Sequence, residues 1–216
     1  MSKIAVVGGT GHLGSALARR LARAGHDITI GSRSAASAEA VALEIGGTTG
    51  FATNAEAARG CDFVLVTVPY AAQAGTLAEI RDSVGTAIVI DATVPLVPPR
   101  VMRVQLPAAG CAALEAQAHL GPDVRLVSAF HNVAAHRLAT DEDVDCDVLV
   151  FSDDTEARAE VTALIESIGM RALAGGSLAN SAAAEALTSI LIFLNKTYKA
   201  DGAGIRFTRL GTAAGG

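Results

Sequence analysis

The feature that most constrains this chain is VVGGTGHLG near the N-terminus, in which Gly9, Gly11 and Gly14 have the spacing G-x-G-x-x-G. An apolar run, Lys3 to Val7, precedes it, and a stretch with leucine at every fourth position follows. These patterns predict a buried strand, a turn and an amphipathic helix. In this context Gly9 permits the tight turn, Gly11 lets a pyrophosphate approach, and Gly14 allows close packing of helix on strand. The segment therefore predicts a dinucleotide-binding site.

The helix that follows the glycines adds its own attraction for phosphate. A helix N-terminus has unpaired N–H groups and the positive end of the helix dipole. We expect Thr10, His12 and Leu13 to contact the cofactor there, through their backbone.

Strand and helix patterns alternate along most of the chain, which predicts a parallel sheet covered on both faces. We expect a Rossmann-type, doubly wound α/β fold with a dinucleotide-binding domain over residues 1–129 and a small C-terminal α/β domain over 130–216. The expected strands are Lys3–Val7, Asp27–Ile30, Gly50–Thr53, Asp62–Val68, Thr86–Asp91, Val124–Ala129, Val148–Phe151 and Arg171–Leu173. The expected helices are Gly11–Ala24, Ala35–Ile45, Ala55–Arg59, Ala71–Val84, Ala112–His119, Thr155–Ser167 and Ser181–Tyr198, with a proline-rich loop over Pro95–Pro107.

Composition excludes several classes of function. The net charge is −5 and no cluster of Lys or Arg occurs, so we expect no nucleic-acid partner. No apolar run approaches the roughly 20 residues that span a bilayer, and no signal peptide is recognisable, so we expect a cytoplasmic protein without membrane contact. Cys61, Cys111 and Cys146 have neither metal-ligand nor disulfide spacing. We expect no metal.

The end of the second expected strand indicates which dinucleotide binds. NAD-binding proteins place an acid there for the ribose 2′-hydroxyl. This chain reads ITIGSR, with no acid before Glu39. Ser32 can donate a hydrogen bond and Arg33 a bidentate, charge-assisted contact to a 2′-phosphate. We therefore predict selectivity for NADP.

The fourth expected strand ends in TVP. Ligands of such sheets lie beyond the carboxyl ends of the strands. Thr67, Val68 and Pro69 are therefore expected to line the path towards the nicotinamide, although Pro69 is equally suited to begin the next helix.

Several motifs occur in a characteristic order: GGTGHLG, GSR, TVP, PLVP at Pro95, SAFH at Ser128, DVLVFSDD, LANS, EALTSILI and GAGIRF. With them the chain resembles the NADPH-dependent reductases of the deazaflavin coenzyme F-420 (F420) over nearly its whole length. The resemblance implies hydride transfer between C4 of the nicotinamide and C5 of the deazaflavin, with both small molecules held in a cleft closed by the C-terminal part.

The resemblance also implies site residues. Thr10 to Leu13, Ser32, Arg33, Val68 and Ala135 would contact NADP. His131 and Asn132, with Gly204 and Ile205, would lie near the deazaflavin. No catalytic acid or base is assigned, because the cofactors carry the chemistry.

Departures from the family pattern leave alternatives open. Ser37 replaces a basic residue, Tyr70 a tryptophan, Ala134 a proline and Ala182 an arginine suited to an anionic tail. An NADPH-dependent reductase of another acceptor (a flavin, ferric iron, a carbonyl or an imine) and a non-catalytic NADP(H) sensor are the alternatives. A short-chain dehydrogenase would need Tyr-x-x-x-Lys, which neither tyrosine provides.

The last expected helix is apolar around most of its circumference, from Leu187 to Leu194. One face against a sheet needs fewer apolar residues than this. Either a homodimer interface or a wall of the acceptor pocket would bury the remainder, and we expect a homodimer.

Overall fold

A computed structural model describes residues 1–46 and 49–211. Its strands form a single sheet in the order β3-β2-β1-β4-β5-β6-β7-β8. The strands are β1 (Lys3–Val7), β2 (Asp27–Ser32), β3 (Gly50–Thr53), β4 (Phe63–Val66), β5 (Ile88–Asp91), β6 (Leu126–Ser128), β7 (Asp147–Phe151) and β8 (Arg171–Gly176). All neighbouring strands are parallel except β6 and β7. The predicted Rossmann-type fold is confirmed.

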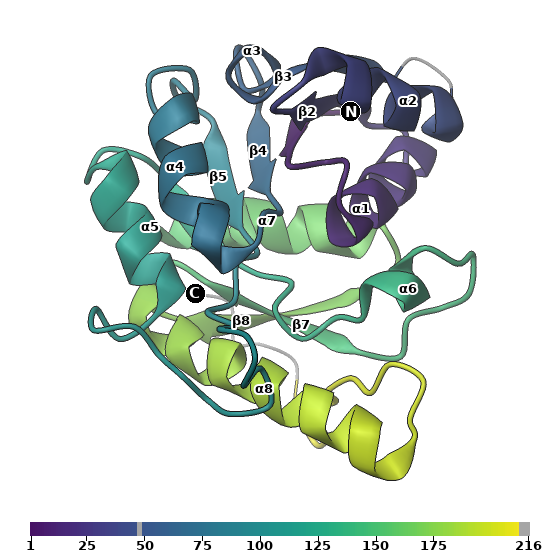
Figure 1. Ribbon diagram of the computed structural model, residues 1–216, viewed down its shortest axis with the longest axis vertical. Coiled ribbons are helices and arrows are strands. Elements are labelled where there is room, and N and C mark those ends of the chain that lie inside the picture. Colours follow the sequence, from purple (N-terminus) through teal and green to yellow (C-terminus); the bar gives the residue numbers. More distant parts are fainter. Residues whose placement is uncertain (47–48, 212–216) are drawn as a thin grey trace.

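Helices cover both faces of the sheet (Figure 1). They are α1 (His12–Arg23), α2 (Ala35–Ile45), α3 (Asn54–Ala57), α4 (Tyr70–Ile80), α5 (Ala112–Leu120), α6 (Ala135–Leu138), α7 (Thr155–Ser167), the 3-10 turn η1 (Leu178–Asn180) and α8 (Ser181–Tyr198). Two hydrophobic clusters fill the two interfaces: one contains residues of α1, α2 and α7, the other residues of α3, α4 and α5. The alternation along β1 explains the division, because Ile4 and Val6 belong to the first cluster and Ala5 and Val7 to the second.

The C-terminal part continues the same sheet. The antiparallel junction of β6 and β7 consists of one pair, Ser128 with Phe151, whereas β7 and β8 pair along their whole length. The segment Ile205–Phe207 then returns to β7, where the Asp147 N–H donates to the Ile205 carbonyl at 2.7 Å. A separate domain over 130–216 stays a prediction, with the sheet continuous across its boundary.

Some element boundaries differ from those expected. The strand expected over Asp62–Val68 ends at Val66, because the chain turns away there to form the site. β2 instead runs on to Ser32, which makes that serine the last residue of the strand. The short helix α6 was not expected, since four residues are too few to show a helical period.

The helix α8 lies on the lower side of the molecule (Figure 1) and packs against α5 and η1. By length and composition alone the segment Leu178–Tyr198 could cross a membrane, with a mean hydropathy of 1.3 over its best 18-residue window. One such helix is weak evidence, and α8 also carries Glu185, which is 1 % exposed and accepts backbone N–H groups at the start of α5. The absence of membrane contact stays a prediction.

Candidate active site

The glycine turn after β1 is packed as its sequence predicts. The Gly9 N–H lies 3.1 Å from the Val6 carbonyl and 3.0 Å from that of Gly31, which ties the turn to both β1 and β2. A methyl group on Gly14 would lie 2.8 Å from Cα of Gly9 and 2.5 Å from Oγ1 of Thr67. Gly11 has more room, since its nearest neighbour would be a carbonyl oxygen at 3.4 Å. Gly14 therefore serves packing, and Gly11 leaves space for a ligand.

The N-terminus of α1 is open to an anion. Its N-cap is Gly11, which has no side chain to accept a bond, and the first backbone hydrogen bond of the helix is from the Ser15 N–H to the Gly11 carbonyl. The N–H groups of His12, Leu13 and Gly14 therefore have no partner within the helix. Such groups, with the helix dipole, attract a pyrophosphate.

The region beyond β2 suits a 2′-phosphate. Ser32 is buried at the strand end, and Arg33 is exposed and makes no ion pair within the described residues. The helix α2 begins two residues later, and its N-cap, Ser34, makes no side-chain capping bond. The start of α2 therefore adds a second positive helix end beside Arg33. Sequence reasoning missed this helix end.

A cavity of about 250 Å³ joins these elements. Its lining includes predicted residues: Thr10, Gly11, Ser32, Arg33, Thr67, Val68 and Pro69. Gly9, His12, Leu13 and Gly14 frame the turn beside it. Pro69 is the N-cap of α4, so it also begins the next helix. The contact of these residues with NADP stays a prediction.

Asn54 is a residue that sequence reasoning missed in this cavity. It is 2 % exposed, its Oδ1 accepts the Gly8 N–H at 3.3 Å, and its Nδ2 donates to Glu79 at 3.2 Å. It thereby ties the glycine turn to α4. The only sequence signal was its place just after Thr53, whose capping box with Glu56 starts α3.

Ala135 lies apart from this lining, as the first residue of α6. That helix packs on α1. Arg20 of α1 donates hydrogen bonds to the carbonyls of Leu138, the last residue of α6, and of Thr140, two residues later. Contact between Ala135 and the cofactor stays a prediction.

A second cavity, of about 140 Å³, lies between the loop after β6 and α8. It is lined by His131, Asn132, Val133, Ala134, Thr188, Leu191, Ile192, Asn195 and Ala203. Of the four residues expected near the deazaflavin it thus includes His131 and Asn132. Gly204 is next to a lining residue but packs on Cys146, and Ile205 bonds to the start of β7. Their contact with an acceptor stays a prediction.

The loop that carries His131 is firmly held. The preceding Phe130 has a φ of 69°, a left-handed conformation that is rare for an aromatic residue. Asn132 Nδ2 donates to the Ala184 carbonyl at 2.8 Å, and Thr188 Oγ1 donates to the His131 carbonyl at 2.8 Å. Burial lowers the pKa of His131 to about 4, so its imidazole is neutral near pH 7.

The buried carboxyl group of Asp91 lies at the end of β5. This strand lies between β4, which leads to the first cavity, and β6, which leads to the second. Thr93 Oγ1 donates to it at 2.6 Å and Gln73 Nε2 at 2.7 Å. Burial nevertheless raises the pKa of Asp91 to about 6, against an ordinary value of 3.8. The group fixes the strand end rather than facing either cavity, because it is fully enclosed.

Asp91→Asn is expected to change how stability depends on pH. A carboxyl whose pKa is raised in the folded state stabilises the fold below its unfolded pKa, and this contribution is lost as pH rises through about 6. From pH 4 to pH 7 the wild type should therefore lose on the order of 2 kcal/mol of unfolding free energy relative to the variant. Urea unfolding at both pH values measures this. Parallel pH profiles would contradict the assignment.

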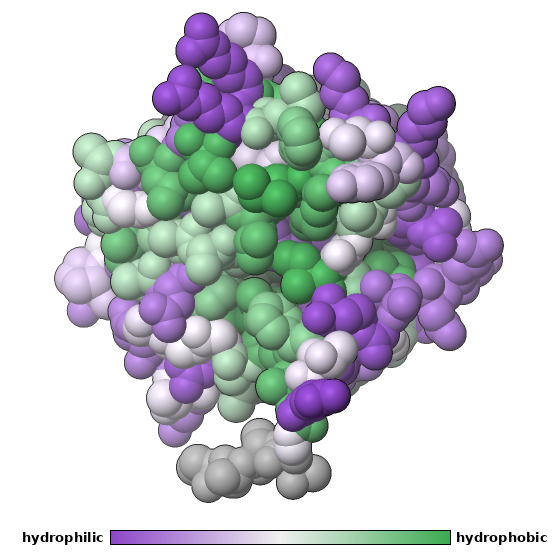
Figure 2. Space-filling model, turned by 90° about the horizontal axis from the view of Figure 1, so that it is seen from below, coloured by the Kyte–Doolittle hydropathy of each residue, from purple (hydrophilic) through white to green (hydrophobic). Residues whose placement is uncertain are grey.

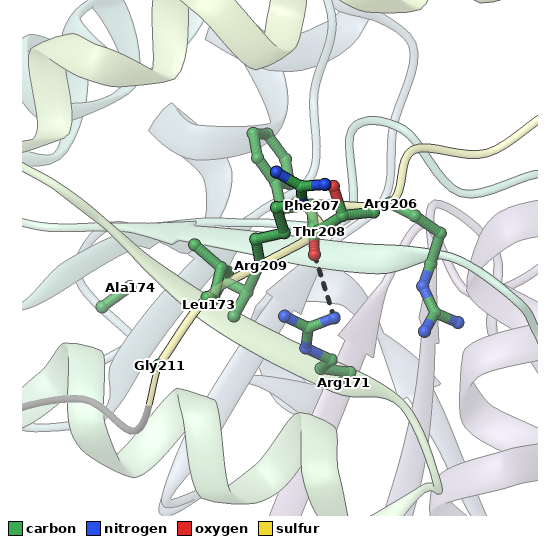
Figure 3. Close-up of a pocket in the computed structure, with 9 residues that line it drawn as sticks. Arg171, Leu173, Ala174, Arg206, Phe207, Thr208, Arg209 and Gly211 are labelled. Atoms are coloured by element: carbon green, nitrogen blue, oxygen red, sulfur yellow. Dashed lines mark hydrogen bonds between the residues drawn. The ribbon is translucent and has the colours of Figure 1, made fainter.

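A larger hollow, of about 710 Å³, lies at the far edge of the sheet on β8. Figure 3 shows Arg171, Arg206 and Arg209 around it, and Arg171 donates to the Phe207 carbonyl at 3.2 Å. Arg206 pairs with Asp145. Two of these cations therefore hold the C-terminal segment on the sheet. No residue predicted for the site lies there, and four strands separate β8 from β1, a distance of roughly 24 Å.

NAD(P)-dependent oxidoreductases of the Rossmann type have a dinucleotide-binding turn at the carboxyl end of one strand, and a second cavity lies beyond the ends of neighbouring strands. Here β1, β4, β5 and β6 are neighbours, and their carboxyl ends lie on one edge. Among the described residues no group of three or more His, Cys, Asp or Glu side chains could hold a metal.

Comparisons with known proteins identify the family within this class. A family model described as NADP oxidoreductase, coenzyme F420-dependent, matches residues 3–95. The F420-dependent NADP reductase of Methanothermobacter thermautotrophicus is 42 % identical over 96 % of this chain and 95 % of its own, and that of Methanocaldococcus jannaschii is 38 % identical over 96 % and 99 %. The chain belongs to the F420-dependent NADP reductase family.

Solved structures share the fold. A protein of Arthrobacter sp. FB24, named as a candidate F420-dependent NADP reductase, superposes with a TM-score of 0.84 at 24 % identity, covering 97 % of this chain and 100 % of that one. A hypothetical protein of Sinorhizobium meliloti has a TM-score of 0.71 at 27 % identity, covering 84 % and 88 %.

Proposed function

We propose that this chain catalyses hydride transfer between NADP(H) and F420. The observation that carries the proposal is the edge formed by the carboxyl ends of β1, β4, β5 and β6. The cavity lined by Thr10 and Arg33 and the cavity lined by His131 both lie along this edge. The names of relatives about 40 % identical over nearly the whole chain support the same acceptor.

The protein's contribution is binding and orientation. The start of α1 and Arg33 would hold the pyrophosphate and the 2′-phosphate, and Thr67 and Val68 would direct the nicotinamide along the strand ends. With both molecules bound, a hydride would pass from C4 of the nicotinamide to C5 of the deazaflavin, and a proton from solvent would complete the reduction. The chain must hold these carbons about 3–3.5 Å apart and exclude water.

Steady-state assays under anaerobic conditions test the acceptor. We expect oxidation of NADPH, followed by absorbance, with F420 and little or none with FMN, ferric iron or an imine. Turnover with one of those acceptors but not with F420 would establish the alternative reductase. Tight NADP binding without turnover of any acceptor would indicate the sensor.

We also propose that two copies associate through an apolar face. On α8, Ile190 is 43 % and Phe193 49 % exposed, and Met102, Val104 and Leu106 of the long loop are exposed as well. Figure 2 shows apolar surface across much of the side seen from below, where α8 lies. A contiguous apolar patch of this kind favours a protein partner.

Light scattering at micromolar concentration should give the mass of two chains for the wild type and the mass of one chain for Phe193→Lys. A wild-type mass of one chain would refute this.

The remaining partners follow from charge. We propose that the partners include neither nucleic acid nor a membrane, as the net charge of −5 favours, and that the reaction takes place in the cytoplasm.

A further inference from the structure

A buried row of polar side chains leads from α8 to the second cavity. His131 Nε2 lies 2.7 Å from Ser128 Oγ, which lies 2.8 Å from Ser181 Oγ, and Ser181 donates to Oε1 of Glu185 at 2.9 Å. The four residues are at most 6 % exposed. Because the atoms that join these four side chains are buried, each hydroxyl or ring proton has few alternative acceptors. The direction of each hydrogen bond therefore follows from its neighbours.

Glu185 sets the direction in which the hydrogen bonds of the row are donated. Its Oε2 accepts the Ala112 N–H at 2.7 Å, and its Oε1 accepts the Ala113 N–H at 3.1 Å. Both groups belong to the start of α5, whose N-cap, Cys111, provides no capping side chain. Two of the three partners of Glu185 are backbone N–H groups, which can only donate, and the third, the Ser181 hydroxyl, donates to Oε1, so the carboxylate anion matches all of them. Burial raises the pKa of Glu185, while these donors and the helix dipole favour its anion.

The remaining protons are then determined. A serine hydroxyl has one proton to donate. Ser181 donates its proton to Glu185, so Ser128 must donate to Ser181. His131 Nε2 must then donate to Ser128. The imidazole is neutral because its burial disfavours the cation. His131 therefore has its proton on Nε2 and a lone pair on Nδ1.

The free lone pair belongs to a residue that lines the second cavity. Within residues 1–46 and 49–211, no hydrogen-bond partner of Nδ1 is found, and the one fully enclosed side-chain polar atom that lacks a partner is Oδ1 of Asp147. Nδ1 is therefore not fully enclosed, and the space that His131 lines is the second cavity.

We propose that Glu185, acting through Ser181 and Ser128, fixes the Nε2–H tautomer of His131, so that Nδ1 accepts a hydrogen bond from an N–H or O–H group of the hydride acceptor. The ring N–H of a pyrimidinedione is a donor of the required kind. Glu185, Ser181 and Ser128 are positioning residues. The part that concerns the acceptor rests on the proposed function; the tautomer does not.

Nitrogen-15 NMR of the full chain labelled at histidine tests the tautomer directly. The spectrum contains five histidines, and His131→Gln identifies the signals of His131. We expect protonated Nε2 and unprotonated Nδ1 at neutral pH. In Ser181→Ala the proton of Ser128 is released to donate to Nε2, so the Nδ1–H form should appear. Ser189→Ala, which removes another buried hydroxyl of α8, should leave the wild-type pattern. A wild-type Nδ1–H tautomer, or identical spectra for Ser181→Ala and wild type, would overturn the proposal.

Kinetics separate this proposal from the function on which it draws. We expect Ser181→Ala to raise KM for F420 about 3- to 10-fold, the value of one hydrogen bond, with KM for NADPH unchanged. Ser189→Ala should match the wild type. If the NMR result is as expected but wild type does not turn over F420, the proposed function fails and the tautomer assignment stands. If F420 is turned over and all three proteins have the same KM, the role of the row fails instead.

Discussion

Arg33→Ala is expected to raise KM for NADPH by roughly 10- to 100-fold while KM for NADH changes little. The guanidinium makes no ion pair within the described residues, so its removal leaves no buried charge behind. A charge-assisted hydrogen bond to a phosphate contributes about 1.5–3 kcal/mol, and NADH lacks the phosphate that would receive it. Steady-state kinetics with both nucleotides, or calorimetry with NADP and NAD, measures the effect.

Arg81→Ala is the matched control for this variant. Arg81 is also exposed, but it follows the far end of α4, eleven residues and about 16 Å beyond the site end of that helix. It should leave both KM values unchanged. Equal losses for NADPH and NADH in Arg33→Ala would show that Arg33 does not recognise the 2′-phosphate.

Gly14→Ala is expected to cost about 1–3 kcal/mol of unfolding free energy and most of the affinity for NADP. The added methyl would lie within 2.8 Å of the Gly9 backbone, which cannot move without disturbing both β1 and β2. To make room, α1 must shift from β1, and the shift also displaces the N–H groups that face the pyrophosphate. Urea unfolding and NADP titration measure the two effects.

Gly75→Ala provides the comparison within the same chain. Gly75 lies in the middle of α4, and a methyl group there would meet nothing within 4 Å. Alanine is the better helix former, so this variant should gain about 0.5–1 kcal/mol. If both substitutions had the same effect, close packing of Gly14 on the turn would not be what the site requires.

The nucleotide half of the site could be predicted from the sequence because its requirements are local. Gly9, Gly11 and Gly14 serve one turn, and the residues after β2 are neighbours in the chain. The alternation of strands and helices likewise indicates parallel pairing, since each crossover needs a helix.

The acceptor half could not be predicted as fully, because it depends on contacts between distant segments. Glu185 binds the start of α5, more than seventy residues earlier, and Asn132 donates to the carbonyl of Ala184, fifty-two residues later. Neither contact leaves a periodic signal. The single pair that joins β6 to β7, and the short helix α6, are too small to be read from the hydrophobic pattern.

Transfer of deuterium from nicotinamide-labelled NADPH to F420 tests the central claim most directly. Single-turnover reactions with each C4 epimer of the deuterated nucleotide, followed by mass spectrometry, locate the label. Direct transfer between adjacent rings predicts that one epimer delivers its deuterium to C5 of the reduced deazaflavin, with a slowed rate and no loss to solvent. Reduced F420 that carries no deuterium with either epimer, with the label released to water, would contradict a site that holds the two molecules together.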